Sequence, residues 1–163
     1  TSLHTRSYDI RGAGLGDVMA AMGASGPIGS AGRTEMATRL SYGYVQGPSG
    51  YVLTRIELAD SIVQTLPRWL DKAKAAPCLQ AQWDGVLAAL RRHEDGHKRK
   101  FMEYRPAVLA ALAATAPQPS AEDLKRRVAE ITGRVMGEID AWHRAYDERT
   151  RHGVAEGVVL RAC

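Results

Sequence analysis

Within residues 1–70, apolar and polar side chains alternate with a period of two, which is typical of β-strands. Four segments are expected to be strands, residues 4–10, 35–44, 51–58 and 62–66, and the alternation is clearest in the second and third of them. The sequence Gly47-Pro48-Ser49-Gly50 predicts a turn between the second and third segments, and Pro67 is expected to end the fourth. Asp17 is expected to cap a short helix between the first two segments. This part of the chain therefore predicts a small, mostly antiparallel sheet beside one short helix.

Residues 79–153 show the helical period instead. Apolar residues recur every three or four positions from Trp83 to Leu112 and again from Leu124 to Tyr146. Pro106 lies inside the first of these segments and is expected to kink the helix or to split it in two. Ser120 is expected to cap the second helix, and Gly153 to follow its C-terminus. We therefore expect two long antiparallel helices after the sheet.

The composition agrees with one domain over residues 1–163 and an α+β fold. The chain is 45% hydrophobic and 25% charged, close to the globular average, and no apolar run is long enough to span a membrane. Its 22 Lys and Arg residues against 18 Asp and Glu residues give a formal charge of +4, which is too small to indicate a nucleic-acid partner. The first residue is Thr1 rather than Met, so we expect that an export leader has been removed.

The first long helix carries the sequence His93-Glu94-Asp95-Gly96-His97, which matches the pattern H-E-x-x-H. Residues four apart lie on one face of a helix, so His93 and His97 can bind one zinc ion. Glu94 lies near that ion but off the axis of its ligands, where it can deprotonate a zinc-bound water. A chance match is expected in roughly one such chain in a hundred. Here all three side chains share the apolar face of the helix, where polar groups without a metal would be costly.

With this motif in place, the chain resembles a family of predicted secreted zinc-dependent proteases of bacteria, of the DUF922 type. The residues that carry the resemblance extend through most of the chain: Tyr8 with Gly12, Gly26-Pro27, Thr65-Leu66-Pro67-Arg68-Trp69, Trp83, the His93–His97 motif and Tyr146-Asp147-x-x-Thr150-x-His152-Gly153. The resemblance implies a zincin-like fold, a zinc cofactor, a peptide or protein substrate, and a secreted or periplasmic location. In an exported protein, Cys78 and Cys163 are also expected to form a disulfide.

A catalytic zinc ion usually has three protein ligands and a water molecule, so a third ligand is needed. His152, in the closing motif, is the preferred choice. Asp147 is the second choice, either as the ligand or as a residue that orients a ligand histidine. If the two helices form a hairpin around residues 117 and 118, two further side chains come close to the motif: Glu138 and His143.

The expected activity is metal-assisted peptide hydrolysis with Glu94 as the general base. Tyr146, or a histidine that is not a ligand, is expected to stabilise the oxyanion of the tetrahedral intermediate. The substrate is expected to bind as an added strand at an edge of the sheet.

Two other functions remain open. The first is a zinc-binding or structural module without turnover, which a fourth protein ligand would favour. The second is a di-metal carboxylate site built from Glu94-x-x-His97 and Asp140-x-x-His143, although such sites are usually found in four-helix bundles.

Overall fold

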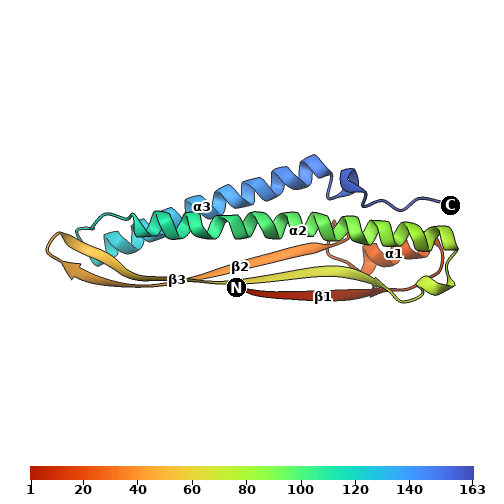
Figure 1. Cartoon of the computed structure of the whole chain (residues 1–163), viewed down its shortest axis with the longest axis horizontal. Helices are drawn as coiled ribbons and strands as arrows, with labels where there is room; N and C mark the ends of the chain where they lie inside the picture. The colour runs from red at the N-terminus through yellow and green to blue at the C-terminus, as the bar shows by residue number, and fades with distance from the viewer.

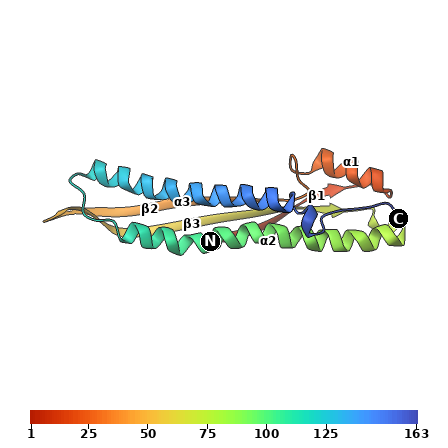
Figure 2. The same cartoon turned by 90° about the horizontal axis from the view of Figure 1, so that it is seen from above.

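A tight turn folds two long strands into a hairpin, and a third strand completes the sheet. The computed structural model describes residues 1–163. In chain order its elements are β1 (Ser2–Ile10), α1 (Leu15–Ser25), β2 (Arg33–Gly47), β3 (Gly50–Trp69), η1 (Lys72–Lys74), α2 (Pro77–Ala113), α3 (Ala121–Thr150) and η2 (Val154–Glu156). The sheet lies below the two long helices in Figure 1, and Figure 2 shows these helices side by side and running in opposite directions. The α+β class and the order of its parts agree with the prediction.

The sheet is mixed, which corrects the prediction of a mostly antiparallel one. Its strand order is β1-β3-β2, with β2 antiparallel to β3 and β1 parallel to β3. A tight hairpin turn forces the strands that it joins to be antiparallel. β1 is separated from β3 by α1 and β2, so no turn sets its direction. A period of two is the same for both directions, and the pattern alone therefore did not distinguish them.

β3 is one strand of 20 residues rather than the two segments 51–58 and 62–66. The polar residue that separates them, Asp60, is only 6% exposed. Its carboxylate accepts a hydrogen bond from Thr38 of β2 at 2.9 Å and forms an ion pair with Arg105 of α2. Because the buried carboxylate has these partners, the strand continues through a polar position.

Two prolines lie inside elements that they were predicted to end or divide. Pro67 lies in β3 just beyond Thr65, which pairs with the first residue of β2, so the strand has only β1 beside it there. Pro106 lies on the exposed face of α2, which continues through it as a single helix. Met102, whose carbonyl loses its usual helical partner, is exposed too, so water can replace that partner.

The helix ends follow the expected caps in part. Ser120 caps α3 as predicted, its hydroxyl accepting the N–H of Asp123 at 3.0 Å. Gly14 rather than Asp17 is the N-cap of α1, and the Asp17 carboxylate accepts the N–H of Gly14 at 3.2 Å. α3 ends at Thr150, and the chain then turns through three residues with positive φ: Arg151, His152 and Gly153.

Two apolar clusters hold the helices to the sheet. The larger one joins α2, α3 and β3: Leu58, Ile62, Phe101, Tyr104, Val108, Leu112, Val128, Ile131, Val135 and Ile139. The smaller one joins α1, β1, the end of β3 and the start of α2: Ile10, Val18, Trp69, Ala75, Leu79 and Trp83. Residues 93–97 lie on α2 between the two clusters, so the motif is held from both sides. Among the helices, none has the length and apolar character of a membrane span.

Candidate metal centre

The middle of α2 presents the polar residues of the motif to the interior. His93 and Glu94 are each 3% exposed, and His97 is 8% exposed. Leu90 and Phe101, before and after them, are among the most buried residues of the core. Packing of these apolar neighbours therefore turns the same face of α2, with both histidines and the glutamate, toward the sheet and α3.

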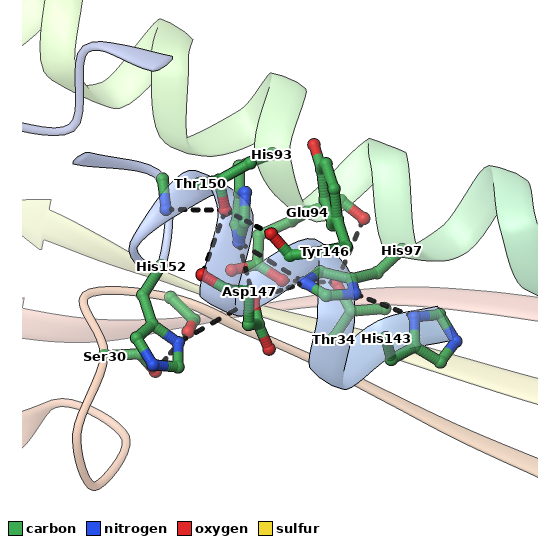
Figure 3. A network of polar contacts seen from close by, with 12 residues as sticks. Ser30, Thr34, His93, Glu94, His97, His143, Tyr146, Asp147, Thr150 and His152 are labelled. Carbon is green, nitrogen blue, oxygen red and sulfur yellow. Dashed lines mark hydrogen bonds and ion pairs between the residues drawn. The ribbon is translucent and has the colours of Figure 1, made fainter. Parts of the chain in front are cut away.

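Asp147 of α3 meets the two histidines (Figure 3). Its Oδ1 lies 3.2 Å from Nε2 of His93 and 3.1 Å from Nε2 of His97, and the two nitrogens are 3.3 Å apart. No other group of three His, Cys, Asp or Glu side chains in the chain converges on one point in this way. The three atoms therefore define one candidate metal site.

The donor set and its spacing fit a zinc ion. Four ligand atoms arranged tetrahedrally at about 2.0–2.1 Å from zinc lie about 3.3 Å from one another. The three distances found here are 3.1–3.3 Å. Burial lowers the pKa of His97, which favours the neutral imidazole that a metal needs. Two imidazoles and one carboxylate also match zinc sites that keep a fourth position for water.

The candidates for the third ligand lie at different distances from the histidine pair. Asp147, the second choice, is the residue that joins the histidine pair. His152, the first choice, lies at the surface with a side chain 60% exposed, and its Nδ1 is 3.7 Å from Oδ1 of Asp147. Glu138 points to solvent and pairs with Arg134. The geometry therefore favours Asp147 over His152.

Glu94 is buried beside β2, where Thr34 orients it. The Thr34 hydroxyl donates to Oε2 of Glu94 at 2.6 Å, which leaves Oε1 without a hydrogen-bond partner from the protein. The absence of a side chain at Gly32 lets Glu94 lie close to the backbone before β2, because a Cβ there would lie 3.1 Å from Oε1 of Glu94 and 3.0 Å from Leu90. Burial raises the pKa of the Glu94 carboxyl, and the hydrogen bond from Thr34 opposes that rise. A carboxylate with one free oxygen and a raised pKa is suited to accept a proton.

His143 contacts His97 on the side away from Asp147. The two Nδ1 atoms are 2.8 Å apart. If Nε2 of His97 binds a metal, its Nδ1 carries the proton and donates to Nδ1 of His143. Burial and the nearby His97 lower the pKa of His143 to about 4, so it is a neutral acceptor at physiological pH. His143 is thus an outer partner of a ligand rather than a third ligand.

The corresponding outer partner of His93 is Glu156, from η2. Its Oε2 lies 2.9 Å from Nδ1 of His93, and its Oε1 accepts the Tyr146 hydroxyl at 2.9 Å. The Tyr146 ring stacks on His93 with centroids 4.9 Å apart. Burial, and then the contact with Glu156, raises the pKa of Tyr146 to about 12. Because its hydroxyl is bound to Glu156, the geometry does not support the predicted role of Tyr146 in oxyanion stabilisation.

The candidate metal site opens into a groove with a volume of about 690 Å³. Its lining comes from α2, α3, the turn after α3, β2 and the loop before β2: Ile28, Gly29, Ser30, Ala31, Gly32, Arg33, Thr34, Met36, Leu90, His93, Glu94, His97, Asp140, His143, Asp147 and His152. Tyr146 does not contribute to this lining. A volume of this size is within the range of sites that bind small molecules or a few residues of a peptide.

Several residues of the site were not found from the sequence. Thr34 lies in a strand where its hydroxyl gave no periodic signal, and Glu156 lies beyond the last recognised motif. A glycine inside a helix, such as Gly96, is a sequence sign of a close contact. A Cβ at this position would lie 2.6 Å from the Tyr146 hydroxyl oxygen, so Gly96 makes room for that ring. The contacts of Thr34 and Glu156 join distant segments of the chain, and no feature of the neighbouring sequence indicated them.

With this arrangement established, comparison with known proteins assigns the chain to a family. The model of the family described as "Bacterial protein of unknown function (DUF922)" matches residues 5–153. The match covers most of the chain, so this protein belongs to that family, as its motifs had indicated. No curated protein and no solved structure matched the chain.

Proposed function

We propose that this protein is a zinc-dependent peptidase with His93, His97 and Asp147 as the metal ligands. The observation that carries the proposal is the convergence of three ligand atoms within 3.1–3.3 Å of one another, beside the buried Glu94 and at the floor of a groove. A zinc ion bound there supplies Lewis-acid chemistry and a water molecule with a pKa of about 7.

Glu94 is the proposed general base and acid. Thr34 holds one oxygen of its carboxylate, and the other is free to accept a proton from the attacking water. As the hydroxide adds to the peptide carbonyl and the C–N bond breaks, Glu94 passes this proton to the leaving amine. The protons then balance without a further acid. Burial raises the pKa of the Glu94 carboxyl in the metal-free protein, which favours its acceptance of a proton.

A histidine at the rim of the groove is the proposed oxyanion stabiliser. His152 lines the groove and is exposed, and it is not held by a closer partner than Asp147 at 3.7 Å. It takes the role first expected of Tyr146, whose hydroxyl donates to Glu156. An exposed imidazole beside the metal ligands can donate to a developing oxyanion when a substrate is bound.

The free edge of β2 is the proposed binding site for an extended peptide. β2 pairs only with β3, and three residues near its start, Arg33, Thr34 and Met36, line the groove. An unpaired edge offers backbone N–H and C=O groups to an added strand. A peptide bound along this edge passes over the metal ligands, which agrees with a protein or peptide substrate.

The test is the variant Glu94→Gln. Cleavage of an unfolded, fluorescently labelled protein is expected to fall by about 10²–10⁴-fold, while one zinc ion per chain stays bound. Glu103→Gln, an exposed position on the same helix, is the matched control and should keep full activity. A Glu94→Gln protein that retains zinc and cleaves at the wild-type rate would refute the proposal, as would a wild-type protein whose cleavage is insensitive to chelators.

The alternatives make different predictions for the metal. A structural zinc site needs a fourth protein ligand, whereas three ligand residues converge here. A di-metal site needs Asp140 and His143 to bind a second ion, whereas Nδ1 of His143 faces His97. Elemental analysis that finds two metal ions per chain would favour the di-metal site.

We also propose a secreted or periplasmic location. Cys78 and Cys163 form the expected disulfide, and the chain has no free cysteine. Disulfides persist in oxidising compartments. Detection of the bond by non-reducing mass spectrometry of protein taken from its native compartment tests this proposal, and two free thiols there would contradict it.

A further inference from the structure

The C-terminal tail, residues 153–163, returns along α2 toward the start of that helix (Figures 1 and 2). Glu156 reaches His93, and a Cβ at Gly157 would lie 3.6 Å from Ala89. Further on, the N–H of Arg161 donates to Gln82 at 3.0 Å. The tail finally ends at the disulfide between Cys163 and Cys78. Its contacts therefore follow α2 backwards from the metal motif to the N-terminal end.

Few polar contacts hold the tail in this position. Most backbone hydrogen bonds of residues 154–159 are formed within the tail and its turn. Apart from Glu156, the polar contacts to α2 are those of Gln82 with Arg161 and with the sulfur of Cys163. Leu160 adds an apolar contact with the smaller cluster. The covalent bond at its end is therefore the strongest restraint on where the tail lies.

Glu156 acts on His93 through hydrogen-bond geometry. Its carboxylate, 2.9 Å from Nδ1, can only accept, so Nδ1 of His93 carries the proton. Nε2 of His93 then keeps its lone pair, and this atom is the one that faces Asp147 and His97. The Tyr146 hydroxyl donates to the other carboxylate oxygen and keeps Glu156 in place. Carboxylates that hold a ligand histidine in this way set its tautomer and raise its basicity.

We propose that the disulfide-bound tail is part of the metal centre: Glu156 positions His93 for the metal, and the Cys78–Cys163 bond keeps Glu156 on His93. This inference rests on the proposed metal site but not on peptidase activity. Glu156 lies beyond residue 153, where the match to the family ends. Glu156 is a positioning residue, because it touches a ligand and not the reacting atoms.

The first experiment measures zinc affinity by competition with a zinc-binding dye. Glu156→Ala is expected to lower the affinity by about 10–100-fold. Glu156→Gln should restore part of the loss, because its amide oxygen can accept from His93 and its amide nitrogen can donate to Tyr146. Glu148→Ala, an exposed position on α3 without a side-chain partner, is the matched control and should leave the affinity unchanged.

The second experiment tests the role of the disulfide. The double variant Cys78→Ser/Cys163→Ser should lower zinc affinity, and adding Glu156→Ala to it should lower the affinity no further than Glu156→Ala alone. Gln82→Ala, which removes a polar anchor of the tail and leaves the disulfide intact, should give a smaller loss and serves if the double variant does not fold. Circular dichroism of the metal-free proteins checks that each variant is folded.

The outcomes separate this inference from the proposed function. Wild-type zinc affinity in Glu156→Ala would overturn the role of Glu156, even in a protein that cleaves peptides. If the losses of zinc affinity from the disulfide variant and from Glu156→Ala were additive, the proposed role of the disulfide would be overturned. The bond would then affect the site by a route other than Glu156. A wild-type protein that cleaves no peptide, but whose zinc affinity falls in Glu156→Ala, would support this inference and refute the proposed peptidase activity.

Discussion

The two ends of the candidate metal centre, His93 and His97, differ in the residue that contacts each ring on the side away from the candidate site. His93 contacts a carboxylate, Glu156, which comes from the tail beyond the helices. His97 contacts a neutral imidazole, His143, from the neighbouring helix α3. A carboxylate stabilises the proton on the histidine more strongly than an imidazole does. The His93 end is therefore held by charge and depends on the tail, whereas the His97 end is held by the packing of two helices.

The groove follows the same division. Next to His97 it is lined by His143, and Asp140 of α3 and Met36 of β2 also belong to its lining. Next to His93 the chain after α3 turns inward, and the buried Gly153 allows it, because a Cβ there would lie 3.3 Å from the ring of His93. One residue of that turn, His152, still faces the groove. The proposed metal binding and the proposed substrate contact at this end thus both involve the short segment that follows α3.

The largest expected effect comes from removing Asp147, the proposed third ligand, which contacts both histidines. Asp147→Ala should lower zinc affinity by more than about 100-fold, because loss of a ligand exceeds loss of an outer partner. His152→Ala should leave the affinity within about threefold of wild type and slow cleavage by about 10–100-fold. Dye competition and a cleavage assay on the same samples measure both. The reverse pattern would make His152 the ligand.

The next effect compares the two outer partners directly. His143→Ala should lower zinc affinity by about 2–10-fold, less than Glu156→Ala, because a neutral acceptor is lost rather than a charged one. His143→Gln should recover much of that loss, since its amide oxygen can accept the N–H of His97. Equal losses at the two ends, measured by the same competition assay, would remove the distinction between them.

A smaller effect concerns the Tyr146 ring, which packs against both His93 and His97. Gly96→Ala should destabilise the protein by about 1 kcal/mol, because the added Cβ would lie 2.6 Å from the Tyr146 hydroxyl oxygen. Gly85→Ala on the same helix meets no atom within 4 Å and should stabilise it by a similar amount. Urea unfolding of the metal-free proteins measures both changes, and equal signs would contradict the packing argument.

The smallest effect is a pH dependence of the metal-free protein. Burial raises the pKa of Glu94, so the folded state binds this proton more tightly than the unfolded state does. The free energy of unfolding should therefore fall as the pH rises from the ordinary glutamate pKa to the raised one, and this part of the slope should vanish in Glu94→Gln. Unfolding with a chelator present, across that range, tests it. An unchanged slope would show that Glu94 is not desolvated in solution.

Local sequence signals predicted much of this protein. The helical spacing of His93, Glu94 and His97 placed them on one buried face, because that relationship depends only on helix geometry. The period of two located β2 and the first part of β3, and Ser120 marked the start of α3. The family motifs led to the family assignment. The helical face, the strands and the cap are each determined by residues close together in the chain, whereas the family motifs are spread along most of it.

Only the tertiary structure decided the features that depend on distant segments. The parallel direction of β1, the continuity of β3 through Asp60 and the choice of Asp147 over His152 all depend on contacts between elements. The hydrogen bonds of Thr34 with Glu94 and of Glu156 with His93 also join distant segments, because the two residues of each pair lie 60 and 63 positions apart in the chain. The sequence by itself indicated the groups of the candidate site, among them His93, Glu94 and His97. Packing of the sheet, the two helices and the tail determined which of them meet, because hydrogen bonds and metal ligation act only over a few ångströms.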